Sequence, residues 1–489
     1  MVALKLLKFR SLLHSVFIFY LILAFNITLT FTKQFAYFEV PQQSAGAGGS
    51  SAAYWVSEAF ANSSVKINTT IYEQSSDVGG RVKLINFERD GINIPIELGA
   101  SIFVDVNYHL VENAEKFGLE FIKYGEELEN SKMGIWNGKE FVFEQSFSSY
   151  WDIMKLFWKY GLAPMKVQNL VKEVIGKFLE EYKYDEPFTS IDSESERLQL
   201  DEERKFNAQY YLSELKNINQ LYLQHFVEPL TRVNYGQNLA EMHALGAFIS
   251  LAPQGAKSIK GGNFQLFEKF IEHSGANLKL NTRITKVTRL PTPKGIKNDV
   301  KYAVKASDGT SEIFDAIILA SPIQFTGIEF KNMDFKIKEI PYVTLHVTLV
   351  VGLINPAYFG RTKIEEVPNQ IVTTNSGKCE FLSLGGKFQL PNGETVNKFF
   401  SHQELSDEML DRLYTNRSWT FRKAWKSYPK LLPNQTFPQL EPVDGFFYIN
   451  SFEPYISTME TECVSSRNIV KLLSKKWSGL HLKPIKAKL

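Results

Sequence analysis

The chain has 489 residues, with 55 Lys and Arg against 53 Asp and Glu, so its formal net charge is only +2. This balance gives no support for a nucleic-acid partner, which would favour a strongly basic surface. Hydrophobic residues make up 44% of the chain, enough for a large core in one α/β unit or in two or three domains. The two cysteines, Cys379 and Cys463, form no metal-ligand cluster, and the sequence leaves open whether they form a disulfide.

The N-terminal residues have the pattern of a secretory signal. Basic residues at positions 5, 8 and 10 precede an apolar run from residue 12 to residue 29. The run is almost long enough to span a bilayer, so an uncleaved signal anchor is the alternative to a cleaved peptide. We therefore expect a lumenal chain in the secretory pathway, with N-glycosylation sequons at Asn62, Asn416 and Asn434. A fourth sequon, at Asn68, falls in a predicted strand and is expected to stay unused.

Residues 44–73 have the order of a dinucleotide-binding unit. The segment Ser44-Ala-Gly46-Ala-Gly48-Gly49 opens a helix of small residues predicted from residue 50 to about residue 61, and an extended run over 65–72 ends at Glu73. Glycines let backbone N–H groups approach a pyrophosphate at a helix N-terminus, and the acid can accept hydrogen bonds from a ribose. We therefore predict that Ser44, the three glycines and Glu73 contact a dinucleotide.

The start of this unit departs from the usual pattern. Ser44 stands where G-x-G-x-x-G has its first glycine, and residues 38–43 include Pro41 and two glutamines. Proline cannot donate a ladder hydrogen bond, and a central parallel strand is normally a continuous apolar run. The first strand is therefore expected to be weak or displaced.

Two further glycine motifs point to a flavin. Glu73 is followed by Gly79-Gly80-Arg81, which resembles the FAD-binding start of the amine-oxidase-like flavoproteins; by that resemblance Gly80 and Arg81 approach the flavin pyrophosphate. Glu97-Leu-Gly99-Ala100-Ser101 resembles the second FAD contact of these proteins, where the backbone passes the flavin ring or ribityl chain. A plain turn between strand and helix is the alternative for the second motif.

The middle of the chain is predicted to be mostly helical. Two helices over 147–184 are separated at Pro164, and their lysines alternate with aromatic and aliphatic residues. Such a pattern fits a helix on a membrane surface, or a core-facing helix with a solvated lysine face, which we favour. Residues 185–203 are charged and are predicted to form a surface loop, followed by further helices to about residue 273.

The C-terminal half alternates strands with loops. Residues 277–290 are predicted as one strand containing Val287, and the run over 342–350 as another containing His346, which is either a core residue or a pocket candidate. Residues 425–438 are predicted as a loop. A strand ending at Glu453 precedes a last helix, for which Ser457 or Thr458 with a nearby Glu is a capping pattern.

Taken together, the motifs between about residues 46 and 473 resemble the prenylcysteine oxidase family, whose plant form is called farnesylcysteine lyase. The resemblance implies an α/β fold: a Rossmann-type, glutathione-reductase-like FAD-binding domain with an inserted α+β substrate domain. It also implies FAD contacts at Val287, Glu453, Ser457, Thr458 and Met459. The expected division is a signal at 1–32, FAD-binding parts at 33–110, 261–330 and 441–489, a helical prenyl-binding part at 111–260 and a substrate sheet at 331–440.

The resemblance further implies a reaction. These enzymes use non-covalent FAD to oxidise the thioether of a free prenylated cysteine, and water and dioxygen yield a prenyl aldehyde, cysteine and hydrogen peroxide. A long prenyl substrate needs a deep apolar pocket, which we expect within 147–178. Membrane association and a lysosomal, vacuolar or endomembrane location are further expectations. No catalytic side chain is predicted beyond the candidate His346. The alternatives are another flavin-dependent amine or polyene oxidoreductase, or a non-catalytic secretory glycoprotein.

Overall fold

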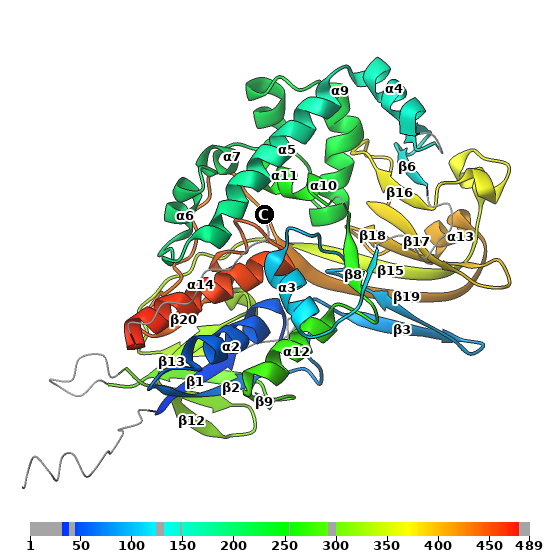
Figure 1. The fold of residues 1–489 in the computed structure, drawn as a ribbon. Helices are drawn as coiled ribbons and strands as arrows, with labels where there is room; N and C mark the ends of the chain where they lie inside the picture. Colours follow the sequence, from blue (N-terminus) through cyan, green and yellow to red (C-terminus); the bar gives the residue numbers. More distant parts are fainter. Residues whose placement is uncertain are drawn as a thin grey trace, which may run out of the picture.

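The computed structural model describes residues 32–38, 45–123, 132–146, 149–253, 255–291 and 300–478. Its centre is a five-stranded parallel sheet in the order β20-β13-β1-β2-β9 (Figure 1). The strands come from distant parts of the chain: β1 Thr32–Phe38, β2 Lys66–Tyr72, β9 Asn277–Lys279, β13 Ala316–Leu319 and β20 Phe446–Tyr448. This arrangement confirms the Rossmann-type domain predicted from the sequence.

Strand β1 explains the atypical start of the dinucleotide-binding unit. It lies between β13 and β2, with Phe35 opposite Ala316 on one side and Thr69 on the other. A central strand must pair along both edges, so the ladder uses Thr32–Phe38 and ends before Pro41. The strand is therefore displaced towards the N-terminus, as the sequence suggested. Ser44 lies outside the described residues.

Three helices cover one face of this sheet: α2 Ala47–Phe60, α12 Phe264–Ser274 and α14 Met459–Ser478 (Figure 1). Helix α2 packs between the other two. Its side toward α14 carries small residues, and Ser51 Oγ lies 2.7 Å from Ser466 Oγ on α14. Small side chains let the axes of α2 and α14 lie close together. The N-termini of these two helices therefore lie in the same region of the molecule.

A four-stranded sheet packs on the other face. It has the order β12-β11-β10-β14, with β10 Ile284–Arg289, β11 Tyr302–Ala306, β12 Ser311–Phe314 and β14 Glu329–Lys331. The prediction of a single strand over 277–290 is wrong: β9 and β10 belong to different sheets. Asn281 between them has a left-handed φ of 53°, and its N–H donates to the Ser75 carbonyl, which turns the chain.

The second large unit is a seven-stranded sheet in the order β19-β15-β18-β17-β16-β6-β7. Its members are β6 Met133–Trp136, β7 Phe141–Glu144, β15 Tyr342–Ile354, β16 Gln370–Thr373, β17 Ser383–Gln389, β18 Thr395–Ser401 and β19 Tyr414–Pro429. The prediction of a loop from residue 425 is wrong for its first part, because β19 pairs with β15 as far as Pro429 opposite Tyr342. Trp425 is thereby held in a strand.

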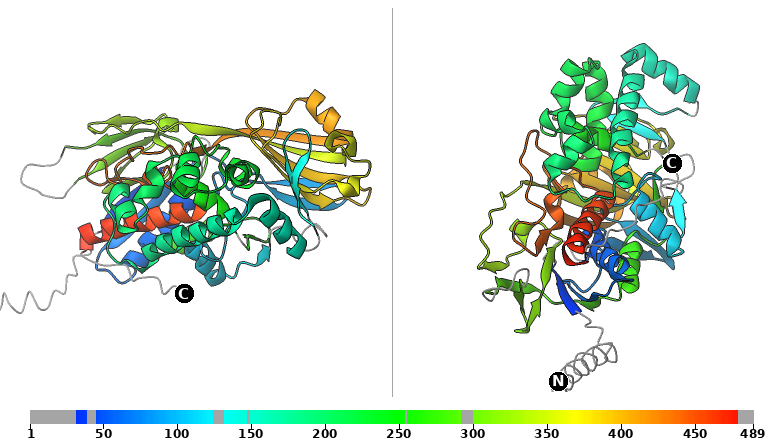
Figure 2. Two further views of the ribbon diagram at one scale, coloured as in Figure 1. Left: turned by 90° about the horizontal axis from the view of Figure 1, so that it is seen from above. Right: turned by 60° about the vertical axis from the view of Figure 1, so that its left-hand side comes forward.

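The helical segment lies beside α14 (Figure 2). It includes α3 Tyr108–Lys116, α4 Ser149–Tyr160, α5 Ala163–Leu179, α6 Ile191–Arg197, α7 Asp201–Lys205, α9 Gln220–Tyr222, α10 Glu228–Tyr235 and α11 Ala244–Leu251. The predicted surface loop over 185–203 is wrong, because it contains α6 and part of α7. The helix α6 is stabilised by a capping box between Ser190 and Ser193, and it buries Ile191.

The part of the chain that the structure describes contains no helix long and apolar enough to cross a bilayer. The predicted signal segment, residues 1–32, lies outside the described residues except for Thr32, which begins β1.

Candidate functional site

A cavity of about 710 Å³ lies where the parallel sheet, the seven-stranded sheet and the helical segment meet. Its walls include Ala320 just beyond β13 and Asn450 just beyond β20. These positions lie at the carboxyl ends of parallel strands, where α/β folds bind their ligands. The cavity therefore stands where a Rossmann-type domain holds a cofactor.

The first glycine turn forms one end of the cavity. Gly46 is the N-cap of α2, and Gly46, Ala47 and Gly48 line the wall. The first turn of α2 has no acidic residue, so the positive end of the helix dipole faces the cavity without a competing carboxylate on that helix. Gly49 is buried in α2 but is not part of the wall.

The second glycine turn lies against the first. The N–H of Gly79 donates to the Ala45 carbonyl at 2.9 Å, and Gly79, Gly80 and Arg81 all line the cavity. Gly79 and Gly80 have φ values of 119° and 62°, which a residue with a Cβ rarely adopts. The two motifs that the sequence predicted for a pyrophosphate are thus brought together on one wall.

Glu73 lies at the end of β2 and is fully buried. Its carboxylate accepts hydrogen bonds from the N–H groups of Ala45 and Ser75, which fixes the glycine turn to the strand. It does not line the cavity, and its contact with a ribose stays a prediction. The same holds for Val287, which is buried in β10 where the four-stranded sheet packs on the parallel sheet.

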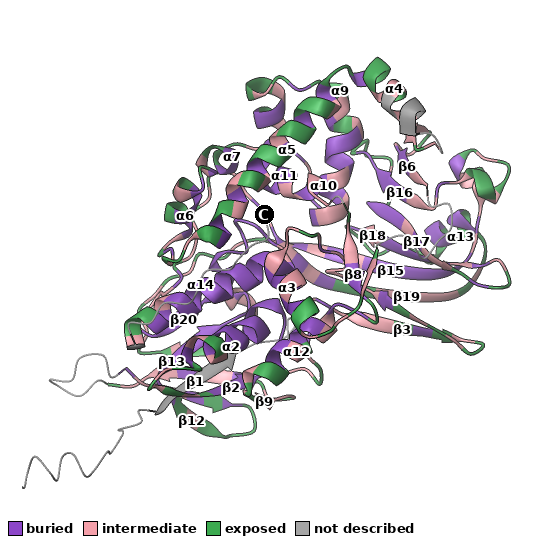
Figure 3. Cartoon of the chain, viewed as in Figure 1, coloured by how far each residue is buried: buried purple, intermediate pink, exposed green. Residues whose placement is uncertain are grey.

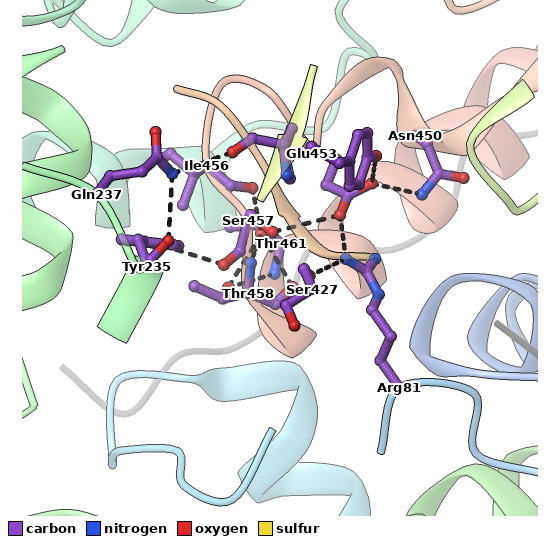
Figure 4. A network of polar contacts seen from close by, with 12 residues as sticks. Arg81, Tyr235, Gln237, Ser427, Asn450, Glu453, Ile456, Ser457, Thr458 and Thr461 are labelled. Atoms are coloured by element: carbon purple, nitrogen blue, oxygen red, sulfur yellow. Dashed lines mark hydrogen bonds and ion pairs between the residues drawn. The ribbon is translucent and has the colours of Figure 1, made fainter. Parts of the chain in front are cut away.

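Arg81 is the centre of a buried polar network (Figure 4). Its Nη1 donates to the Ser427 carbonyl at 2.6 Å and forms an ion pair with Glu453. Glu453 is fully buried and also accepts hydrogen bonds from the Tyr342 hydroxyl at 2.6 Å and the Asn450 amide at 2.9 Å. Burial alone would lower the pKa of Arg81, but Glu453, Tyr342 and Glu462 together outweigh it and hold the pKa above its ordinary value. Arg81 is therefore a fixed cation in the wall.

Glu453 itself does not line the cavity. The sequence predicted it as a direct cofactor contact, whereas the structure places it behind Arg81. Its influence on a ligand in this cavity therefore passes through the position of the guanidinium.

The third predicted contact, residues 99–101, lines the cavity next to the seven-stranded sheet. Ala100 has a left-handed φ of 51°, and its carbonyl accepts a hydrogen bond from the Asn263 side chain at 2.9 Å. Gly99 leaves space for Trp425: a Cβ at this position would stand 2.8 Å from Cζ2 of the indole ring. The glycine is therefore needed for the close approach of the ring.

A buried lysine supports the same turn. Lys398 on β18 lines the cavity, and its Nζ donates to the Glu97 carbonyl at 2.8 Å and to Ser101 Oγ at 3.0 Å. Burial raises the pKa of Glu97 to about 7, although the Asn263 N–H and the Lys398 ammonium oppose this. The turn at 99–101 is thus held by side chains from two distant segments, Asn263 and Lys398.

The N-terminus of α14 forms another wall through Ser457, Thr458 and Met459. Thr458 Oγ1 accepts the Thr461 N–H at 3.0 Å, and Thr461 Oγ1 accepts the Thr458 N–H at 3.0 Å. The predicted cap at Thr458 is present, but its partner is Thr461 and not a Glu. Glu460 instead accepts the N–H groups of His109 and Leu110 at the start of α3, at 2.9 and 3.0 Å.

The candidate His346 does not line the cavity. Its neighbour Leu345 does, and successive side chains of a strand point to opposite faces of the sheet. The structure therefore does not support His346 as a pocket residue.

The wall formed by the helical segment and the seven-stranded sheet is mostly apolar, although Asn234, Ser250, Gln370, Ser383 and Lys387 also belong to it. Its apolar residues come from three helices and from the seven-stranded sheet: Ile175, Phe178, Leu230, Val233, Ile249, Ile371, Leu384 and Phe400. Among the described residues of the predicted pocket range 147–178, those that line the cavity, Ile175 and Phe178, lie near the C-terminal end of α5. Phe157 and Trp158 are exposed to solvent instead, because α4 lies at the edge of the helical segment.

Several wall residues were missed by the sequence analysis. Tyr235 and Tyr428 pack edge to face with ring centroids 5.3 Å apart, and the Tyr235 hydroxyl donates to the Ser457 carbonyl at 3.1 Å. Trp425, Lys398 and Glu462 also line the cavity. The lysine inside the alternating run of β18 was a detectable signal, since a charge on a buried strand needs a partner. No comparable signal in the sequence marked Tyr235 and Tyr428.

Comparison with known proteins agrees with this geometry. Residues 143–483 match the family described as prenylcysteine lyase, and residues 45–117 match the NAD(P)-binding Rossmann-like domain. The chain is 30% identical to the farnesylcysteine lyase of Arabidopsis thaliana, over 88% of this chain and 86% of the relative. It is 27% identical to prenylcysteine oxidase 1 of Homo sapiens, over 89% and 88%.

Solved structures with a similar fold include two amine oxidases. A cyclohexylamine oxidase from Brevibacterium oxydans has a TM-score of 0.59 at 12% identity, and covers 91% of this chain and 99% of its own. A putrescine oxidase bound to putrescine has a TM-score of 0.57 at 13% identity, and covers 91% and 99%. At these identities the likeness shows the fold alone.

The contact between Gly99 and Trp425 leads to a prediction. We expect Gly99→Ala to lower the free energy of unfolding by about 1–3 kcal/mol, because the added methyl group forces the ring or the turn to move. Gly176→Ala is the control: it lies in α5 with no atom within 4 Å of the new Cβ, so it should stabilise the protein by about 0.5–1 kcal/mol. Chemical denaturation measures both. A Gly99→Ala protein as stable as wild type would contradict the assigned packing.

Proposed function

The chain belongs to the prenylcysteine lyase family, and we propose that it oxidises free S-prenyl-L-cysteine, with farnesylcysteine as the substrate to test first. The reaction uses one molecule each of dioxygen and water, and yields a prenyl aldehyde, cysteine and hydrogen peroxide. A C–H bond beside sulfur breaks, a C–O bond to water forms, and the C–S bond then breaks. The two electrons removed from the substrate reduce dioxygen. The observation that carries the proposal is one cavity with two parts. We call its glycine turns and Arg81 the phosphate cradle, and its apolar wall of α5, α10, α11 and the seven-stranded sheet the apolar chamber.

The residues of the cradle fit FAD. Two glycine turns without Cβ atoms, the N-terminus of α2 and the cation of Arg81 surround the same space, which suits a pyrophosphate. FAD, when bound, supplies the two-electron acceptor for the oxidation. Gly46, Gly48, Gly80 and Arg81 would hold its pyrophosphate, and the turn at 99–101 would lie along its ribityl chain or ring.

The chain contributes orientation and electrostatics at the junction of the two halves. The positive end of α14 and the Arg81 guanidinium both favour negative charge that develops on a ligand between them. Aromatic rings of Tyr428, Tyr235 and Trp425 form part of the cavity wall and limit the access of bulk solvent to the site. Lys398 and Ser101 present polar groups at the same wall, where a reacting water could be held.

The apolar chamber suits a prenyl chain. Each CH₂ group that leaves water contributes about 0.8 kcal/mol, so an isoprenoid gains most of its affinity from this surface. Val233 and Leu230 on α10 line it together with Ile371 and Leu384 of the sheet. The alternative of another amine or polyene oxidoreductase is not favoured, since the family match covers residues 143–483. A non-catalytic glycoprotein would need neither the cradle nor the chamber.

We also propose that the enzyme meets its substrate at a membrane surface. Phe157, Trp158, Leu162 and Met165 form the corner between α4 and α5, and Trp158 is 80% and Met165 61% exposed (Figure 3). Exposed lysines at 155, 159 and 166 lie beside them. An apolar corner with a cationic border suits an anionic bilayer. The sequence analysis favoured a core-facing helix here, but the apolar side chains of this corner face solvent.

The proposed location is the lumen of the secretory pathway, in a lysosome, vacuole or related compartment. The sequons at Asn62, Asn416 and Asn434 are all exposed, which supports glycosylation. Asn68 is exposed too, but it lies in β2, where its backbone pairs with β1. The cysteines Cys379 and Cys463 are free thiols.

The first of four predictions from the proposed function concerns the redox chemistry. We expect the purified protein to be yellow, and anaerobic farnesylcysteine to bleach its flavin absorbance, because the C–H bond beside sulfur gives up two electrons. Air should restore the colour and yield one hydrogen peroxide per aldehyde. Putrescine is the control and should leave the spectrum unchanged. A protein that binds no FAD, or whose flavin ignores farnesylcysteine, would refute the proposed activity.

The second prediction locates the prenyl chamber. Val233→Trp places a large ring among the apolar wall residues, and we expect the KM for farnesylcysteine to rise at least about tenfold, a loss of about 1.4 kcal/mol in binding. The flavin content should not change, because Val233 lies on α10, which contains none of the residues of the glycine turns. Leu221→Trp, at an exposed position, is the matched control. If both variants had the wild-type KM, the chamber would have been assigned to the wrong residues.

The third prediction tests the membrane corner. The full chain should float with vesicles that contain anionic lipid, and Trp158→Glu combined with Met165→Glu should reduce the bound fraction several-fold. Ile313→Glu, also at an exposed apolar position but on β12, should bind like wild type. Equal flotation of all three proteins would show that this corner is not the membrane contact.

The fourth prediction concerns the compartment. Endoglycosidase treatment of the protein from its native cells should lower its apparent mass, and peptide mapping should place glycans on Asn62, Asn416 or Asn434 and not on Asn68. A chain without glycans at any of the three exposed sequons would argue against a lumenal location.

A further inference from the structure

One acidic side chain in the cavity has no role in the proposed reaction. Glu462 lies in the first turn of α14, and only 8% of the residue is exposed. Its carboxyl group packs against the first turn of α2, where Oε2 would lie 3.1 Å from a Cβ placed on Gly48. Oε1 has no hydrogen-bond partner among the residues that the structure describes. A buried polar atom without a partner, beside the phosphate cradle, points to a ligand.

The charges around Glu462 are unfavourable to its ionised form. Arg81 already binds Glu453 and the Ser427 carbonyl, so one cation serves two buried carboxyl groups. Tyr448, Cys463 and Glu460 also lie in this region of the described chain, and none of them carries positive charge. The first turn of α2, Ala47-Gly48-Gly49-Ser50, has no charged side chain, so that, besides Arg81, it is the helix dipoles of α2 and α14 that favour the anion. A bound pyrophosphate would add two negative charges to the same region.

We propose that Glu462 binds the FAD pyrophosphate or the adjoining ribityl segment as a neutral carboxylic acid, and that its Oε1–H donates a hydrogen bond to the cofactor. This inference depends on FAD being the cofactor, as proposed above. A neutral acid donates a hydrogen bond to an anionic ligand, whereas an ionised carboxylate would repel it. The carboxyl group also packs against Gly48, which restricts its movement. Binding of FAD and protonation of Glu462 are therefore coupled.

The electrostatic environment agrees in direction. Burial, and then the negative charge of Glu453, raise the pKa of Glu462 to about 8, although Arg81 opposes this. Below that pH the acid is already protonated and FAD binding takes up no proton. Above it, the free protein must take up a proton in order to bind, so affinity falls as pH rises. In this range each pH unit costs about tenfold in Kd.

The experiment measures FAD binding by the full-length apoprotein between pH 6 and pH 9.5. We expect the Kd of wild type to be constant below about pH 7.5 and to rise toward tenfold per pH unit above pH 8. Calorimetry at pH 9, in two buffers with different ionisation enthalpies, should show uptake of close to one proton per FAD. Glu462→Gln keeps an N–H donor but cannot titrate, so its Kd should stay flat and its proton uptake should vanish.

Glu272→Gln, on the exposed face of α12, is the control and should keep the wild-type pH profile. A wild-type protein whose Kd does not change with pH, or a Glu462→Gln variant that still takes up a proton, would overturn the inference while FAD binding itself is upheld. Failure to bind FAD at any pH would instead refute the proposed function. If Glu462→Gln does not fold, the pH dependence and proton uptake of the wild-type protein still decide the question.

Discussion

The buried ion pair between Arg81 and Glu453 connects the parts of this molecule that form the site. Arg81 belongs to the second glycine turn, and Glu453 follows the last strand of the parallel sheet. The Ser427 carbonyl on β19 and the Tyr342 hydroxyl on β15 complete the network, so the seven-stranded sheet contributes to it as well. A fully buried carboxylate is tolerated only where such partners surround it. The two sheets must therefore meet in one relative position, and the cavity lies between them.

This constraint also explains why the cavity has two different ends. On the side of the parallel sheet, the helix starts of α2 and α14 and the glycine turns present N–H groups and small residues, because helices in this fold begin at the carboxyl ends of strands. On the other side, α5, α10 and the seven-stranded sheet present aliphatic and aromatic side chains. A ligand with an anionic segment can occupy the first end while an apolar chain occupies the second, and their junction lies beside Tyr428 and Trp425.

The parts of this site that the sequence predicted are those encoded by short, contiguous motifs. The glycine turn before α2, the run of β2 ending at Glu73, and Gly79-Gly80-Arg81 each carry their conformational reason within a few residues. The contacts between motifs were not predictable in this way. Trp425 lies at the site because of the register between β19 and β15. Thr461 is the capping partner of Thr458, whereas Glu460 accepts a hydrogen bond from the start of α3, which the local sequence does not indicate.

The assignments that were incorrect or left open have a common physical cause: one-dimensional patterns do not say which face of an element meets which neighbour. His346 sits in a strand whose hydrophobic pattern is strong on both faces, so its side was undetermined until β18 and β19 fixed the register. The aromatic run around Trp158 has helical spacing that suits a core or a surface, and only the position of α4 at the edge of the helical segment exposes it.

Glu462 shows the reverse case. Acids near a helix N-terminus are ordinarily favourable to the helix dipole, and nothing local marks this one as unusual. Glu462 differs because the N-terminus of α2 faces the same space as the N-terminus of α14. Both helix ends favour a negative charge on its carboxyl group. The buried carboxylate of Glu453 and the charge of the cofactor oppose its ionisation.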